Sequence, residues 1–348
     1  TALASRYVKK LKTFSVTFKG RGYYDESRFA KRIADLFGAE HNEVEVSPNL
    51  KSELEEIVDF LDEPFADSSY IPTYYLAKAT RSNVKVALSG TGGDDIFAGY
   101  RRYTMNYLIS IIEKFPFFVR KAASCIVKNI QKTRSTISGE KAILLERLLA
   151  AAEREKRRRH TYIMSFIDRE MQRYLIDTSQ LNLMEEYQEE VLDDFDEQSD
   201  INQELYSDFI SYLPGDLLKK EDCATMAVAL EARLPLLDHR LVEFSCRVVP
   251  ALKVKKLTTK YILRKAFEET IPRQILYREK HGFAFPIGEY LKDELRDLFI
   301  DTILTAKHRY FDNKKVMEIF SIHQSGKKDF SQHLWAIFIF NLWYKTNG

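Results

Sequence analysis

The sequence predicts an α/β fold, with a parallel sheet in the first part of the chain and a mostly helical second part. Three observations predict it. Before residue 100, strand-like alternating patterns are interleaved with helical patterns of about a dozen residues, as in βαβ units. After Gly99, glycine becomes rare and long helical stretches dominate. Only 13 glycines and 9 prolines occur in 348 residues, which is few for the turns of a many-stranded sandwich. We therefore expect two parts, residues 1–100 and residues 101–348.

The elements of the first part follow from the spacing of apolar residues. Residues 11–18 and 41–46 alternate polar and apolar side chains, which predicts strands. Phe29, Ile33 and Leu36 have helical spacing, and Gly38 marks the end of that helix. In chain order, the sequence predicts a helix over 1–10, a strand over 11–18, a helix over 25–37, a strand over 41–46, helices over 52–61 and 71–82, and a short buried strand over 84–88.

The second part carries an amphipathic helix and two runs of charge. Residues 142–152 have helical apolar spacing. Residues 154–159 are basic, and residues 185–200 contain nine acidic side chains. Both runs favour solvated helix faces or loops, because a nucleic-acid surface needs basic residues spread over a face with aromatic residues between them.

Composition excludes several classes of protein. With 53 Lys+Arg against 51 Asp+Glu, the net charge of +2 argues against a generally basic nucleic-acid protein and against a strongly acidic disordered chain. The three cysteines form no disulfide or zinc pattern, so a reducing cytoplasm fits best. No apolar run reaches the roughly 18 residues of a membrane span. Residues 1–10 have no signal-peptide layout and no initiator Met, so we expect the chain to be cut from something longer.

The most informative segment runs from Leu88 to Tyr100, where a buried strand enters a glycine-rich loop followed by Asp94 and Asp95. Ligands of open α/β sheets bind beyond the carboxyl ends of strands, and glycines let the backbone approach a phosphate or a base. A carboxylate there suits Mg²⁺. The alternative is a plain turn in which either aspartate caps the next helix. The loop is neither a Walker A motif nor a G-x-G-x-x-G motif.

Four charges, Asp222, Glu231, Arg233 and Asp238, are embedded in an apolar stretch that we expect to be helical. Charges in such a setting are rarely buried without partners. They predict either an internal ion-pair network that locks two helices or a polar substrate pocket.

Two cations near the C-terminal third, Lys260 and Arg264, are four residues apart and are therefore expected on one helix face. Together they could hold a polyphosphate. The alternative is an ordinary solvated helix surface.

These segments, in this order, resemble the synthetase domain of glutamine-dependent asparagine synthetases and of their relatives, including β-lactam synthetase. The resemblance covers nearly the whole chain. LSGTGGDD with LEARLPLLD is its most specific part, whereas KYILR alone would be weak. The matching segments are FSVTF near residue 16, DEPFADSS at 62–69, LSGTGGDDIFAGYRRY at 88–103, YLPGDLLKKEDCATM at 212–226, LEARLPLLDH at 230–239, KYILR at 260–264 and KHGFAFP at 280–286.

The resemblance implies a pyrophosphatase-type ATP-binding parallel sheet with helices on both faces. It also implies an N-terminal glutaminase domain, and a Ser-Gly-Gly-x-Asp-Ser phosphate loop directly before the helix that opens this chain. This chain has neither of them, so we expect residues 1–348 by themselves to be inactive. ATP and Mg²⁺ are the implied cofactors, and a homodimer stays open.

Residue by residue, the resemblance puts Val16, Ser89 and Gly90 around the adenine and ribose of ATP. Asp94 would bind Mg²⁺. Lys260 would contact pyrophosphate and stabilise the transition state. Thr91, a further candidate catalytic residue, stands where well-studied bacterial asparagine synthetases have Glu and β-lactam synthetase has Tyr, so the acceptor stays open. Asp222, Glu231, Arg233 and Arg264 are candidates for the substrate pocket.

The implied reaction is the activation of aspartate as β-aspartyl-AMP, with release of pyrophosphate, followed by attack of ammonia from glutamine. Two alternative functions stay open: that of a relative that amidates another carboxylate, and that of a non-catalytic interaction module that keeps the fold. A nucleic-acid binder that uses residues 154–159 is disfavoured by the near-neutral charge. We expect small-molecule substrates, no nucleic acid and no membrane partner.

Overall fold

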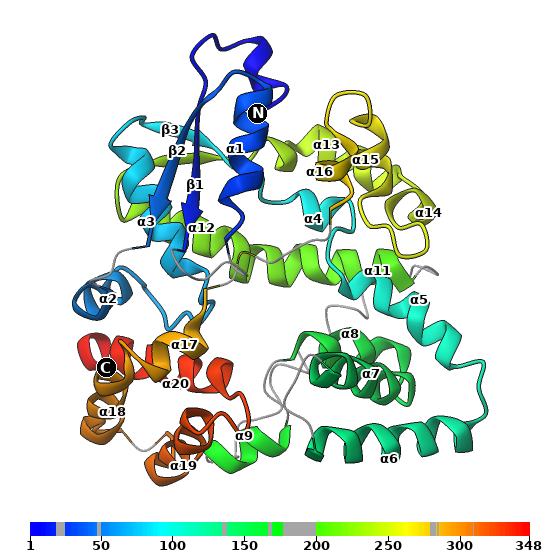
Figure 1. The fold of residues 1–348 in the computed structure, drawn as a ribbon, viewed down its shortest axis with the longest axis vertical. Coiled ribbons are helices and arrows are strands. Elements are labelled where there is room, and N and C mark those ends of the chain that lie inside the picture. Colours follow the sequence, from blue (N-terminus) through cyan, green and yellow to red (C-terminus); the bar gives the residue numbers. More distant parts are fainter. Residues whose placement is uncertain are drawn as a thin grey trace.

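A computed structural model shows a mixed α/β protein in which short strands lie at one end and helices make up most of the rest (Figure 1). The structure describes residues 1–18, 25–46, 50–133, 138–165, 169–176, 200–278, 283, 285–308 and 310–348. The acidic residues 185–199 and most of the KHGFAFP segment lie outside these ranges.

The first part follows the expected alternation of strands and helices. Two expectations are wrong. The opening helix is a single 3₁₀ turn over residues 4–6, because Leu3, Tyr7 and Val8 stay exposed and a short helix that buries no apolar face is marginal. The strand expected to be buried over 84–88 is not buried: Val86 is 44% and Leu88 is 64% exposed, because the described part of the chain pairs this strand with one short strand only. The elements are η1 (Ala4–Arg6), β1 (Lys12–Thr17), α1 (Ser27–Leu36), β2 (Glu40–Glu45), α2 (Leu50–Asp59), α3 (Tyr70–Arg81) and β3 (Val86–Leu88).

The strands are parallel, as expected, but in the described part of the chain they form two separate pairs. β1 pairs with β2, with Lys12 opposite Glu40 and Thr17 opposite Glu45. β3 pairs with β4 (Glu231–Arg233), a segment that we expected to be helical. Glu231 and Arg233 point to solvent while Ala232 is half-buried, which is the two-residue period of a strand.

Helices dominate after residue 92, and the helix expected over 142–152 is confirmed within α7. The elements are α4 (Gly93–Ile96), α5 (Arg102–Ile112), α6 (Phe117–Thr133), α7 (Ser138–Ala152), α8 (Lys156–Met164), α9 (Arg169–Leu175), α11 (Asp200–Ser207), the π-helix η3 (Asp208–Leu218), α12 (Lys219–Met226), η4 (Pro235–Leu237), α13 (His239–Arg247), α14 (Pro250–Lys253), α15 (Tyr261–Ala266), α16 (Arg273–Leu276), α17 (Ile287–Lys292), α18 (Arg296–Thr305), α19 (Asn313–Gln324) and α20 (Ser331–Asn347). Among the described helices, none is long and apolar enough to cross a membrane.

The largest hydrophobic core joins the two ends of the chain. It packs β1, α2 and α3 against α17–α20, with Trp335 and Phe338 almost completely buried at its centre. Val16 and Phe18 enter this core from β1 and from the residue that follows it. The boundary near residue 100 stays a prediction.

Two arginines of the basic run at residues 154–159 make contacts inside the helical part and do not only face solvent. Arg159 is only 8% exposed and forms an ion pair with Glu113. The Arg154 guanidinium stacks 4.0 Å from the ring centre of Tyr162. Both cations are therefore engaged within the helical part, which further disfavours the nucleic-acid alternative.

A buried polar cluster joins α5, α8 and α11 to the start of η3. The carboxylate of Asp208, 1% exposed, accepts from Arg102 Nε at 2.9 Å, from His160 Nε2 at 2.8 Å and from the Tyr103 hydroxyl. His160 Nδ1 lies 3.5 Å from Glu204. Although burial opposes its charge, the bonds to Asp208 and Glu204 raise the pKa of His160 to about 9. The imidazole is therefore a cation at neutral pH.

Replacing Asp208 with asparagine should lower the free energy of unfolding by about 3–5 kcal/mol, because two buried cations lose their shared counter-ion. Urea unfolding measures this. Glu231→Gln, which breaks an exposed pair, is the matched control and should leave stability nearly unchanged. Equal effects of the two substitutions would contradict a buried charged cluster.

The stability that His160 supplies should depend on pH. Its folded pKa, about 9, lies above the unfolded value of about 6.5, so its contribution is complete below pH 6.5 and disappears as the pH rises to 9. We expect the free energy of unfolding to fall by a few kcal/mol across this window, and to fall much less in His160→Gln. A parallel decline in both proteins would mean that another group titrates.

Candidate active site

The glycine-rich loop begins where β3 ends. Ser89 N donates to the Arg233 carbonyl at 2.9 Å, which continues the β3–β4 pairing by one residue. The hydroxyls of Ser89 and Thr91 lie 3.1 Å apart. The backbone then turns sharply at Gly92, whose φ of 92° favours glycine, and α4 begins at Gly93. The loop thus leaves a strand and opens a short helix, as the sequence predicts.

Two leucines of η4 cover this loop. A Cβ at Gly92 would lie 2.3 Å from Leu237, and one at Gly93 would lie 2.7 Å from Leu236. The LEARLPLLD segment therefore has two functions here: it supplies β4, and it covers the glycines of the loop. From the sequence, this segment was expected to matter for its charges and for the family resemblance, and neither expectation included these two functions.

Asp94 and Lys260, both predicted site residues, meet in the folded protein. Lys260 Nζ lies 3.0 Å from Asp94 Oδ1, and their side chains are 25% and 23% exposed. Figure 1 shows α4 close to the α15–α16 region, although these elements are far apart in the chain. A carboxylate and an ammonium, both partly open to solvent, therefore lie just beyond the carboxyl end of β3.

Lys260 and Arg264 do not share one helix face. Lys260 precedes α15 as its N-cap residue, with a left-handed φ of 51° that is uncommon for a residue with a side chain. Arg264, inside α15, is half-buried, and its guanidinium lies 5.4 Å from the centre of the Tyr277 ring. Burial lowers the pKa of Arg264, while the charges of Tyr277 and Asp94 oppose that shift. Arg264 thus lies within the electrostatic reach of Asp94.

The two adjacent aspartates have different environments. Asp95 is 2% exposed, and the Tyr100 hydroxyl donates to its oxygens at 3.2 and 3.3 Å. Burial, together with the charge of Asp94, raises the pKa of Asp95 to about 6. Asp94, by contrast, is partly exposed beside Lys260. Asp94 is therefore the better candidate for a group that meets a charged ligand.

The other predicted residues do not converge on this pair. The side chain of Val16 lies in the main core. Asp222 is exposed, and Arg233 pairs with Glu231 of its own strand at 2.7 Å. Asp238 caps α13 and binds Arg240. These four charges form no internal network, because they lie on exposed positions of a strand, of a helix end and of α12.

A second polar group, which sequence reasoning did not single out, joins α3 to η3 and α12. Asp67 accepts from Ser69 N and Oγ and from Lys220 Nζ, at 2.9, 2.7 and 2.7 Å. Burial opposes its ionisation, but Lys220 and Ser69 keep the pKa of Asp67 below its usual value. Burial and the charge of Asp67 raise the pKa of Asp216 to about 7. The residues of this second polar group lie in DEPFADSS and YLPGDLLKKED, and the polar positions of these two segments could have indicated the group.

The carboxylate chemistry of Asp94 fits Mg²⁺. Among the described residues, no three His, Cys, Asp or Glu side chains gather closely enough to hold a metal by themselves. Mg²⁺ commonly takes one or two carboxylates together with substrate phosphates and water, so a single accessible carboxylate beside a cation is an adequate protein contribution.

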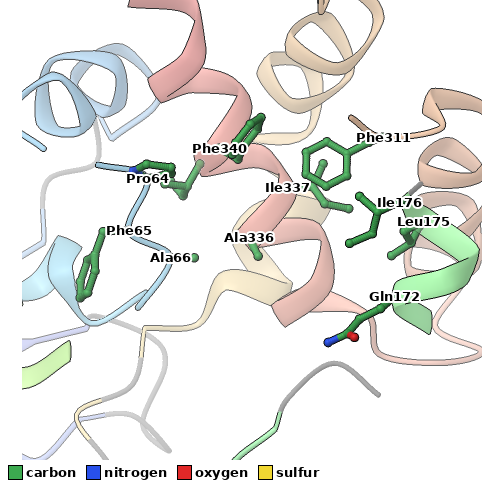
Figure 2. A pocket seen from close by; sticks show the side chains of 11 residues that line it. Pro64, Phe65, Ala66, Gln172, Leu175, Ile176, Phe311, Ala336, Ile337 and Phe340 are labelled. Carbon is green, nitrogen blue, oxygen red and sulfur yellow. The ribbon is translucent and has the colours of Figure 1, made fainter. Parts of the chain in front are cut away.

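An apolar cavity of about 270 Å³ lies elsewhere, between the 64–66 loop, α9 and α20 (Figure 2). Phe311, Ile337 and Phe340 face into it, and Gln172 is the polar side chain at its edge. Charged groups are costly to place in such surroundings, so this cavity does not suit a nucleotide.

A sequence model of the asparagine synthase family matches residues 1–345. The chain belongs to the asparagine synthase family. Among curated relatives, asparagine synthetase [glutamine-hydrolyzing] 1 of Bacillus subtilis is 31% identical and a putative asparagine synthetase of Mycobacterium bovis is 30% identical, each over 99% of this chain. The amidase chyE of Penicillium rubens is 27% identical over 79% of the chain. The chain spans about half the length of these relatives, namely 54%, 52% and 44%.

Proposed function

We propose that this asparagine synthase family chain is the synthetase part of a ligase that makes an amide at the expense of ATP and activates a carboxylate by adenylation. The observation that carries the proposal is the Asp94–Lys260 pair beyond the carboxyl end of β3. In open α/β folds that edge is where ligands bind. The pair supplies a metal-binding carboxylate and a phosphate-binding ammonium at one point.

The nucleotide site is proposed to have the pyrophosphatase-type architecture. Two parallel strand pairs with crossover helices support it. Ser89 and Gly90, in the loop after β3, would contact the adenine and ribose. A Cβ at Gly90 would meet no atom within 4 Å, which leaves its backbone open to a ligand. Val16 would contribute through its backbone, because its side chain is in the core.

Mg²⁺ bound by Asp94 would neutralise the phosphate oxygens of ATP. The protein groups have their own functions. Lys260 would stabilise the negative charge that grows on the leaving pyrophosphate, and Arg264 would add positive potential beside it. Thr91, whose hydroxyl lies beside that of Ser89 in the loop after β3, would contact the acceptor.

The proposed chemistry has two steps. An acceptor carboxylate oxygen attacks the α-phosphorus of ATP, and the bond to pyrophosphate breaks. Ammonia then attacks the acyl carbon, AMP leaves with one oxygen of the carboxylate, and a proton is lost to give the amide. Positioning and charge neutralisation account for most of the rate enhancement in such reactions.

Aspartate is the proposed acceptor and glutamine the proposed source of ammonia, through a glutaminase domain, because two of these relatives are named glutamine-hydrolysing asparagine synthetases. A relative named an amidase keeps another acceptor as the second candidate. We place the reaction in the cytoplasm, where both substrates are available.

The decisive experiment uses the full-length protein, because residues 1–348 by themselves are expected to be inactive. It supplies ATP, Mg²⁺, ammonium or glutamine, and aspartate labelled with heavy oxygen in its β-carboxylate. We expect asparagine, AMP and pyrophosphate in equal amounts, with one labelled oxygen in AMP. ADP and phosphate in place of AMP would overturn adenylation. AMP release that depends on another carboxylate would identify a different acceptor, and no turnover with any carboxylate would favour a non-catalytic module.

A further inference from the structure

The turn that connects α4 to α5 places its glycine at an unusual position. Gly99 N donates to the Asp94 carbonyl at 2.7 Å, the bond that closes a Schellman motif at a helix C-terminus. The glycine of that motif usually occupies the preceding, left-handed position. Here Ala98 takes that position, with φ 54°, and Gly99 has no positive φ. Backbone conformation therefore does not explain why residue 99 is glycine.

Space explains it. A Cβ at Gly99 would lie 1.9 Å from Asp94 Oδ1 and 2.3 Å from Lys260 Cε. Both values are far below van der Waals contact. The bare α-carbon of Gly99 is thus the surface against which the carboxylate and the lysine stem pack. The nearby Gly93 differs, because a Cβ there would approach Lys260 Nζ only to 3.7 Å, an ordinary contact.

We propose that Gly99 is a positioning residue, whose missing side chain allows Lys260 Nζ and Asp94 to meet beyond the end of β3. A methyl group at this position would push the carboxylate, the lysine stem or both aside. The overlapped atoms are the outer atoms of the two side chains, and the Gly99–Asp94 backbone bond keeps the turn in place. The side chains, not the backbone, would therefore move away from the methyl group, and the amine and the carboxylate would separate.

The effect of Gly99 on activity rests on the proposed function, whereas its effect on the distance between Lys260 and Asp94 does not. If the pair binds the phosphates of ATP, its separation by about 1 Å or more should reduce kcat on the order of a hundredfold. The KM for ATP should change less, because other contacts to the nucleotide are retained. The geometric statement, by contrast, can be tested without any turnover.

The test compares Gly99→Ala with two controls in the intact protein. Ala98→Gly relieves the left-handed alanine and adds no atom, and Gly215→Ala adds a methyl group where a Cβ meets nothing within 4 Å. Acylation of Lys260 by acetic anhydride is measured by mass spectrometry against the exposed Lys10 of the same chain. We expect the relative rate at Lys260 to rise several-fold in Gly99→Ala and to stay unchanged in both controls.

A wild-type labelling rate at Lys260 in Gly99→Ala would overturn the proposal. Increased labelling with normal synthesis would support the positioning by Gly99 and instead contradict the proposed function of the pair. Thermal unfolding gives a second test, for the case that Gly99→Ala folds but is too unstable for the labelling experiment. Adding Asp94→Ala removes the carboxylate that the methyl overlaps most and leaves the lysine stem room to move aside. The double variant should therefore recover most of the lost melting temperature, and an additive loss would also overturn the proposal.

Discussion

Replacing Asp94 with asparagine should reduce ATP-dependent amide synthesis by at least about a hundredfold, because removing a metal ligand from a charged transition state costs several kcal/mol. The substitution also leaves Lys260 without the carboxylate that lies 3.0 Å from its amine. Initial rates of AMP formation by the full-length protein at saturating aspartate and ammonium measure the effect. The melting temperature should stay close to that of the wild type, since a partly exposed pair contributes little to stability.

Asp95→Asn is the matched control for this experiment. It makes the same change one residue along, at a buried carboxyl that bonds to Tyr100 and has a pKa of about 6. We expect it to affect stability and to leave most of the synthesis intact. A larger loss of synthesis in Asp95→Asn than in Asp94→Asn would make Asp95, and not Asp94, the metal-binding carboxylate. Normal synthesis in Asp94→Asn would show that Asp94 only contributes to the end of the helix.

In the full-length protein, Lys260→Ala should lower kcat steeply while the KM for ATP changes less. Negative charge grows on the bridging oxygen as pyrophosphate leaves, so a cation beside it is worth more in the transition state than in the ground state. Lys260→Arg should rescue poorly, because a planar guanidinium does not replace a compact ammonium against Gly99, where the space is already filled.

Lys265→Ala is the control for Lys260, because Lys265 is an exposed lysine of α15, the helix that Lys260 precedes, and pairs with Glu268. The Lys265→Ala substitution should leave kcat unchanged. Near-normal synthesis by Lys260→Ala would remove Lys260 from the site. A fall in melting temperature as large as the fall in activity would show a structural function instead.

Local pattern alone determined most of the first part of the fold. Two-residue alternation identified β1 and β2, and helical apolar spacing with Gly38 identified α1, because these signals depend on neighbours within a few residues. The glycine-rich segment after β3 could also be recognised as a loop beside carboxylates. The resemblance to asparagine synthetases rested on this glycine-rich segment and on six other segments spread along the chain, and it is confirmed.

Short segments escaped prediction because their partners are distant in the chain. Glu231–Arg233 is three residues long and contains no β-branched side chain, so only its pairing with Val86–Leu88 makes it a strand. In residues 1–10 the large apolar side chains Leu3, Tyr7 and Val8 stay exposed, so no packed face supports a helix there. In both places tertiary contact outweighed the local signal.

The sequence by itself predicted which groups the site could use: Ser89, Gly90 and Asp94 after one strand, and Lys260 on a later helix. Only the tertiary structure decided that Lys260 meets Asp94, that Glu231 and Arg233 stay in solvent, and that His160 shares Asp208 with Arg102. It also decided why residue 99 is glycine. The physical reason is the same in each case: an ion pair or a close approach between residues distant in the chain depends on where the intervening helices pack, and no local pattern of apolar residues encodes that position.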